Sequence, residues 1–167
     1  MNSSEEYESA WNASYEKGQN HLFYPEEELI RFLSKYIKKQ INISEYVPVS
    51  DIKYNRALDI GCGIGRNILL CETYGFETFG VDLSCAAIQK AISFLKSGGV
   101  EDCEKRLIVA DASKLPFDRH GFDFAISHGT LDSMPYNVAL KVVQEISHYL
   151  PAWKQSPKFL SPNSPFR

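Results

Sequence analysis

The segment Ala57-Leu58-Asp59-Ile60-Gly61-Cys62-Gly63-Ile64-Gly65-Arg66-Asn67 determines how this chain of 167 residues is expected to fold. It begins as an apolar strand and continues through three alternating glycines into a pattern typical of a helix. This arrangement gathers bare backbone N–H groups and the positive end of a helix dipole at one place. Because glycine has no side chain, a ligand can approach such a backbone closely. The segment therefore predicts a site for a nucleotide-type cofactor.

The spacing of the glycines distinguishes between cofactor classes. A dinucleotide fingerprint needs glycines at positions i, i+2 and i+5. Arg66 stands five residues after Gly61, and Ile68 stands five residues after Gly63. A phosphate-binding loop would need Gly-Lys-Ser/Thr after its glycines, and the chain lacks it there. The spacing thus disfavours a nicotinamide-dependent oxidoreductase.

An acid two residues ahead of three glycines, Asp59-x-Gly61-x-Gly63-x-Gly65, resembles motif I of the class I S-adenosylmethionine-dependent methyltransferases. The resemblance covers residues 25–150 and implies an α/β fold, a doubly wound Rossmann-like parallel sheet with strand order 3-2-1-4. It also implies S-adenosylmethionine as the cofactor. That molecule lacks a phosphate but carries an ammonium group, which suits an acid directly or through water. The residues assigned to this end of the cofactor are Asp59, Gly61, Cys62, Gly63 and Gly65.

A second acid, Asp82, follows the next predicted strand, roughly 20 residues after the first glycine, where this architecture binds ribose hydroxyls. One carboxylate can accept hydrogen bonds from both hydroxyls. The alternative is that Asp82 caps the helix that begins near Ser84. In the family, the residue after this acid packs beside the adenine, which here is Leu83.

Two further positions follow from the resemblance. Asp111 and Ala112 come after the third strand, where the family has an acid that accepts from the adenine amino group; Asp111 is alternatively a turn residue. Ser127 ends the fourth strand, at the place of family motif IV beside the sulfonium methyl. His128 and Asp132 follow it and are candidate bases for an acceptor hydroxyl or amine, or structural residues. No catalytic residue is assigned.

Periodicity, capping residues and glycines predict the remaining elements. A helix is expected first, and the segment between it and the first strand is interpreted as a connection. Strands and helices then alternate, as in a parallel sheet. The predicted helices are 25–40, 64–74, 84–97 and 136–149, the connection is 42–55, and the predicted strands are 56–60, 76–81, 106–110 and 122–127.

The two ends of the chain fall outside this pattern. Residues 1–24 are interpreted as a leader or as a lid over the cofactor, with Trp11, Tyr15 and Tyr24 placed there. Residues 151–167 contain four of the eight prolines and are expected to form an extended or disordered tail. The family sheet has seven strands, whereas four are predicted. Either the chain is shortened, or a second copy or another partner covers the edge of the fourth strand.

Composition narrows the class of protein. The net charge of −3 gives no reason to expect nucleic-acid binding, and no apolar run approaches the roughly 18–20 residues of a membrane span. The N-terminus lacks the pattern of a signal peptide, and the four cysteines show no CxxC spacing, so a reducing, cytoplasmic location without a metal site is expected. The resemblance implies methyl transfer to a small-molecule acceptor. The alternative is a non-catalytic cofactor-binding remnant or subunit.

Overall fold

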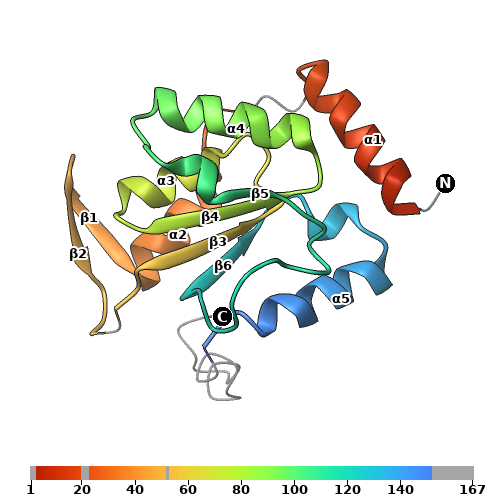
Figure 1. Ribbon diagram of the computed structural model, residues 1–167. Helices are drawn as coiled ribbons and strands as arrows, with labels where there is room; N and C mark the ends of the chain where they lie inside the picture. Colours follow the sequence, from red (N-terminus) through yellow and green to blue (C-terminus); the bar gives the residue numbers. More distant parts are fainter. Residues whose placement is uncertain (1–2, 20–22, 52, 152–167) are drawn as a thin grey trace.

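The computed structural model describes residues 3–19, 23–51 and 53–151. At its centre lies a four-stranded parallel sheet in the order β5-β4-β3-β6 (Figure 1). In sequence these are the third, second, first and fourth of the predicted strands, so the predicted order and fold class are confirmed. The strands are β3 (Arg56–Ile60), β4 (Glu77–Asp82), β5 (Leu107–Val109) and β6 (Phe124–Ser127).

Strand β3 occupies the middle of the sheet because it is apolar on both faces. From Ala57 to Ile60 no residue is more than 1% exposed. Such a continuously buried strand is typical of parallel sheets with helices on both faces. Asp59 pairs in register with Gly80 of β4 and with Ile126 of β6. The carboxyl ends of the three strands therefore meet at one edge of the sheet, where open α/β folds bind ligands.

Helices cover both faces of the sheet (Figure 1). Helices α3 (Arg66–Thr73) and α4 (Cys85–Ser97) pack on one face, and α5 (Tyr136–Ser147) packs on the other. Successive side chains of a strand point to opposite faces of the sheet. Leu58 and Ile60 therefore both pack on the face that α5 covers. The helix of residues 27–36 packs on the same face as α3, against β6.

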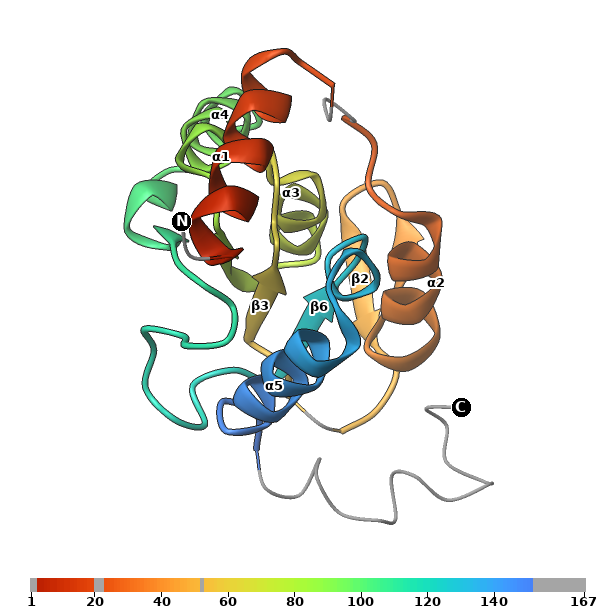
Figure 2. The same ribbon diagram turned by 90° about the vertical axis from the view of Figure 1, so that its right-hand side faces the viewer.

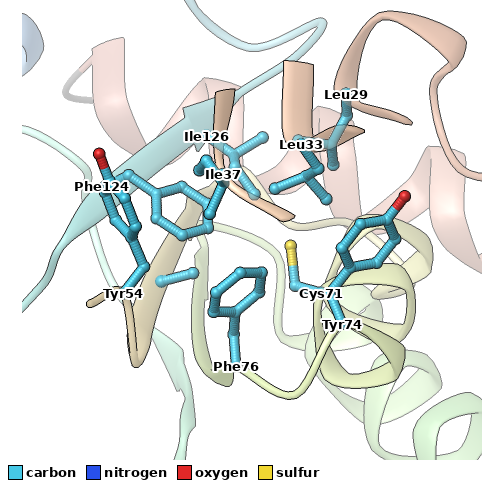
Figure 3. Packing of buried hydrophobic residues seen from close by; sticks show 10 residues of the cluster. Leu29, Leu33, Ile37, Tyr54, Cys71, Tyr74, Phe76, Phe124 and Ile126 are labelled. Atoms are coloured by element: carbon cyan, nitrogen blue, oxygen red, sulfur yellow. The ribbon is translucent and has the colours of Figure 1, made fainter. Parts of the chain in front are cut away.

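That helix, α2 (Glu27–Tyr36), packs through an aromatic cluster (Figure 3). Leu33 is completely buried in it. The ring centroids of Phe76 and Phe124 lie 5.2 Å apart at 83°, an edge-to-face arrangement that aromatic rings favour. Burial of these side chains fixes α2, and with it the residues that precede α2, against the end of the sheet.

The N-terminal residues form a helix, α1 (Ser3–Glu16), which lies beside α4 (Figure 2). Asn12 holds the two helices together. Its Oδ1 accepts hydrogen bonds from the Ser84 hydroxyl at 2.7 Å and from the Ala86 backbone N–H at 3.2 Å. Tyr15 packs among Ile64 and Ala87. Helix α1 is thus docked over the glycine-rich loop.

The main error in the predicted elements lies before the first strand. The predicted helix 25–40 ends at Tyr36, and the expected connection contains an antiparallel hairpin of β1 (Lys38–Asn42) and β2 (Glu45–Pro48). The side chains of β1 are half-buried or exposed, so no alternation marked it as a strand. The other predicted elements begin and end within two residues of the observed ones. Two 3₁₀ turns, η1 (Cys103–Lys105) and η2 (Leu131–Ser133), complete the set.

Three further observations bear on the class of protein. The four cysteines are free thiols. Within the described ranges, no helix has the length and apolar character needed to cross a membrane, and no cluster of three or more metal-ligating side chains occurs. The predicted tail lies outside the described residues, apart from Pro151.

Candidate functional site

A cavity of about 490 Å³ lies at the carboxyl ends of the strands. Its size falls within the range typical of small-molecule sites. Its walls come from α1, the glycine-rich loop, the end of β4, the loop after β5, and the segment from the end of β6 into α5. Seven of the ten predicted site residues line it: Gly61, Cys62, Gly63, Asp82, Leu83, Asp111 and Ala112.

The loop needs glycine at two of these positions. Gly61 and Gly63 have φ angles of +69° and +55°, which other residues rarely adopt. A Cβ on Gly61 would overlap the Thr130 side chain, and one on Gly63 would lie 2.7 Å from the Tyr15 hydroxyl. The loop therefore packs closely against the segment after β6 on one side and against α1 on the other.

Asp82 links the glycine-rich loop to the start of α4. Its Oδ2 accepts from the backbone N–H of Gly63, and its Oδ1 accepts from the backbone N–H of Ser84, both at 2.9 Å. Burial raises the pKa of Asp82, while these hydrogen bonds act in the opposite direction. Ser84 is the N-cap of α4, with its Oγ accepting from the N–H of Ala87. Asp82 therefore supports the helix start and lines the cavity as well; its role toward ribose stays a prediction.

Asp59 lies behind the cavity wall. It is 1% exposed, and its Oδ2 has no hydrogen-bond partner among the described residues. Burial, together with the nearby Asp82, raises the pKa of Asp59 to about 8, against the opposing effect of Arg66. Because Asp59 does not line the cavity, the structure gives no path for its direct contact with a ligand.

Two other predicted residues also lie outside the wall. A Cβ on Gly65 would approach Leu95 and Ala91, so this glycine permits close packing of α4 against the loop. The Ser127 hydroxyl oxygen is buried, and no hydrogen-bond partner for it occurs in the described part of the chain. At the cavity itself, Asp111 Oδ1 accepts from the N–H of Ser113 at 2.8 Å, so Asp111 also shapes a turn.

A charged group centred on Glu26 was not predicted from the sequence. Its carboxylate forms an ion pair with Arg66. It also lies beside the imidazole of His128, whose Nε2 is 3.3 Å from Glu26 Oε2. The backbone N–H of Glu26 donates to Asn67 Oδ1 at 3.2 Å. All four residues line the cavity. The partners of Glu26 lie 40 residues or more away in the chain, so no local pattern links them. Asp132, the other candidate base, does not line the cavity.

Aromatic residues of α1 form another part of the wall. Tyr7, Trp11 and Tyr15 line the cavity, and burial raises the pKa of Tyr15 well above its usual range. Tyr24 does not line it and is 86% exposed, so the structure does not bring Tyr24 together with Trp11 and Tyr15 at the cavity. Tyr24 lies after α1, and its backbone carbonyl instead accepts from Arg66 at 3.2 Å. Whether α1 opens and closes remains a prediction.

Comparison with known proteins gives the family. A family model of the methyltransferase domain matches residues 57–152, more than half of the chain. The chain belongs to the methyltransferase domain family. The match begins in β3 and includes the glycine-rich loop, Asp82, Asp111 and α5, and thus most of the cavity wall.

Individual related sequences and solved structures resemble this chain over more of its length. A sterol 4-C-methyltransferase of Caenorhabditis elegans is 30% identical over 124 residues, which cover 74% of this chain and 34% of that protein. A crystal structure of a Pyrococcus horikoshii protein is 35% identical with a TM-score of 0.54, covering 59% and 45% of the two chains. A magnesium protoporphyrin IX methyltransferase of Synechocystis shares the fold, with a TM-score of 0.63 at 11% identity. The match covers 90% of this chain and 73% of that protein.

The match to longer proteins is partial. The chain spans 34% to 39% of the length of three related sequences, two of which carry the name methyltransferase. What these longer proteins do as a whole is therefore a separate question from the family of this domain.

Proposed function

We propose that this domain binds S-adenosylmethionine and transfers its methyl group to a small-molecule acceptor. The observation that carries the proposal is the convergence of the glycine-rich loop, Asp82 and Asp111 on one cavity at the carboxyl ends of the strands. The family match covers the same residues.

The charges of the cavity suit this cofactor better than a phosphorylated one. Glu26, Asp82 and Asp111 all line the cavity. Such a wall favours a cation and repels a phosphate. The ion pair of Glu26 with Arg66 presents both signs of charge beside the loop, which suits an amino-acid end that carries an ammonium and a carboxylate.

Asp82 retains the capacity to hold a ribose. Each oxygen of an ionised carboxylate has two lone pairs, and in Asp82 one backbone N–H uses each oxygen. The remaining lone pairs can accept two hydroxyl groups. Because both backbone hydrogen bonds fix the orientation of the carboxylate, the ribose would meet a preorganised acceptor. Leu83, Asp111 and Ala112 would then flank the adenine.

When bound, S-adenosylmethionine supplies a methyl group on a positively charged sulfur, which is a good leaving group. The chain's own residues then have to orient the acceptor and exclude water. Tyr7 and Trp11 of α1 close one side of the cavity, and an aromatic face attracts a nearby cation. Positioning of this kind accelerates transfer without a general base, so the proposal assigns no proton to His128.

The test is transfer of a labelled methyl group from S-adenosylmethionine to a panel of small acceptors, with Asp82→Ala as the inactive control. Transfer by the parent chain, lost in the variant, supports the proposal. Circular dichroism of the variant separates loss of activity from loss of fold. Binding of the cofactor without transfer to any acceptor would contradict the catalytic part and favour a non-catalytic cofactor-binding module.

A further inference from the structure

The walls of the cavity differ in charge. The wall formed by the glycine-rich loop and the ends of β4 and β5 carries Asp82 and Asp111, and Glu26 lies beside it. Arg66 on that side forms an ion pair with Glu26. Across the cavity, helix α5 contributes Lys141. The two sides therefore favour ligand groups of opposite charge.

Lys141 differs from Arg66 in having no acidic partner. Among the described residues, no carboxylate lies within ion-pair distance of its ammonium group. Glu145, one turn further along α5, is instead engaged by the backbone N–H of Leu115 and the hydroxyl of Tyr149. The positive charge of Lys141 is thus available to a ligand in the cavity.

Lys141 is exposed, and most of the residues that line the cavity next to it are apolar. Val138 lies three residues before it, on the same face of α5, and also lines the cavity. Met134 and Pro135, which lead into α5, extend this wall. We call Met134, Pro135, Val138 and Lys141 the α5 wall.

Helix α1 faces this wall. Tyr7 and Trp11 belong to the same cavity, and Figure 2 shows α1 and α5 on the side of the sheet where β3 and β6 end. A molecule between them would have apolar or aromatic contacts along its body and a cation at one end.

We propose that the α5 wall binds the methyl acceptor, and that the acceptor is an amphiphilic small molecule with an anionic group held by Lys141. This inference rests on the proposed function, which assigns the acidic side of the cavity to the cofactor. An apolar pocket with one charged residue fixes the orientation of its ligand through that charge. The anionic end at Lys141 would set which part of the acceptor faces the methyl group.

The experiment uses two fluorescent probes that share one ring system. Anilinonaphthalene sulfonate is anionic, and phenylnaphthylamine lacks the sulfonate. Each is titrated into the chain saturated with S-adenosylhomocysteine, whose own affinity is measured first by calorimetry. We expect Lys141→Met to weaken binding of the sulfonate by about three- to tenfold, as for a partly exposed charge pair, and to leave the neutral probe unchanged. Lys141→Arg should retain sulfonate binding.

Two control variants make the result specific. Lys39→Met removes an exposed lysine of the β1–β2 hairpin, away from the cavity, and should change neither affinity. Val138→Ser makes the α5 wall polar and should weaken both probes. Three results would overturn the inference. The affinity for the sulfonate could fall equally in Lys39→Met and Lys141→Met, or Lys141→Met could weaken both probes equally. The parent chain could also fail to bind the sulfonate when S-adenosylhomocysteine is bound.

The affinity for S-adenosylhomocysteine separates this inference from the proposed function. If Lys141→Met weakens S-adenosylhomocysteine itself, Lys141 belongs to the cofactor site and the acceptor assignment is wrong. If the parent chain does not bind S-adenosylhomocysteine, the proposed function fails at its first step, whatever the probes do.

Discussion

The side chain of Asp82 reaches back to the glycine-rich loop and accepts a hydrogen bond from the backbone N–H of Gly63 at 2.9 Å. Asp82 ends β4, and Gly63 lies in the loop that follows the adjacent parallel strand β3. Because the same carboxylate also accepts from Ser84, one side chain orders the loop after β3 and the helix after β4. The structure of the cavity and its charge thus depend on the same residue.

Asp82→Ala tests this double role. The substitution leaves the buried N–H groups of Gly63 and Ser84 without acceptors, at a cost of about 1–3 kcal/mol in the free energy of unfolding. We also expect the affinity for S-adenosylhomocysteine to fall at least about tenfold, since charged hydrogen bonds contribute roughly 1.5–3 kcal/mol. Urea denaturation and calorimetry measure the two effects. A variant that binds as tightly as the parent would show that Asp82 does not hold the ribose.

Gly61→Ala should destabilise the chain for two separable reasons, the positive φ angle and the overlap with Thr130. The matched control is Gly99→Ala, at φ +83° with nothing within 4 Å of an added Cβ. The control isolates the conformational cost of about 1–2 kcal/mol. Gly61→Ala should lower the free energy of unfolding by about 1 kcal/mol more than Gly99→Ala does, because of the steric overlap. Denaturant unfolding of both variants measures the difference.

A double variant checks the steric part. Thr130→Gly removes the side chain that an alanine at position 61 would meet. The two substitutions together should cost less than the sum of their separate effects, which is the signature of a direct contact. If the effects of the two substitutions simply add, the destabilisation by Gly61→Ala comes from the positive φ angle alone and not from contact with Thr130.

Asn12→Ala should detach α1 from the start of α4, since Asn12 accepts from both Ser84 Oγ and the Ala86 N–H. Loss of comparable caps costs about 0.5–2 kcal/mol. We expect limited proteolysis to cleave α1 faster in this variant. Circular dichroism should show that the sheet and the remaining helices are unchanged. Unchanged proteolysis would show that the contacts of Tyr15 and Trp11 suffice to hold the helix.

The sequence was most informative where local pattern and burial coincide. The apolar run of β3, its glycines and the acid at the end of β4 carried a family resemblance, and that resemblance implied the order of the central strands. Strand β1 was missed because its exposed side chains carry no alternation, and the helical pattern of α2 continued into it. Local patterns cannot show where a helix stops when neither glycine nor proline marks the end.

The candidate site was predictable only in part, because its charges meet through long-range contacts. Glu26 contacts His128 across 102 residues, and Asn12 accepts a hydrogen bond from the hydroxyl of Ser84, 72 residues away. Nothing in the local pattern links these positions. Asp59 illustrates the opposite case: the motif was evident, but only the structure showed that its side chain lies behind the cavity wall and not on it.

Asp59→Asn tests the burial of this carboxyl through the pH dependence of stability. The pKa of Asp59 is raised to about 8, so the folded chain keeps a proton that the unfolded chain releases above about pH 4. Stability therefore falls as pH rises from about 4 to about 8, and it levels off above about pH 8. The folding equilibrium constant falls by at most about tenfold per pH unit. Asn remains neutral and removes this contribution.

We expect Asp59→Asn to gain stability relative to the parent between about pH 4 and pH 8, with little difference at the acidic end. Urea unfolding of both chains across this range measures the difference. Two parallel stability curves would show that Asp59 ionises in the folded chain as it does in the unfolded one.

Calorimetric titration with S-adenosylhomocysteine, with NAD as the control ligand, tests the central claim most directly. The account predicts micromolar binding of S-adenosylhomocysteine, on the order of −8 kcal/mol, and no binding of NAD. Absence of binding by S-adenosylhomocysteine, or binding of NAD in its place, would contradict the claim that this cavity is an S-adenosylmethionine site.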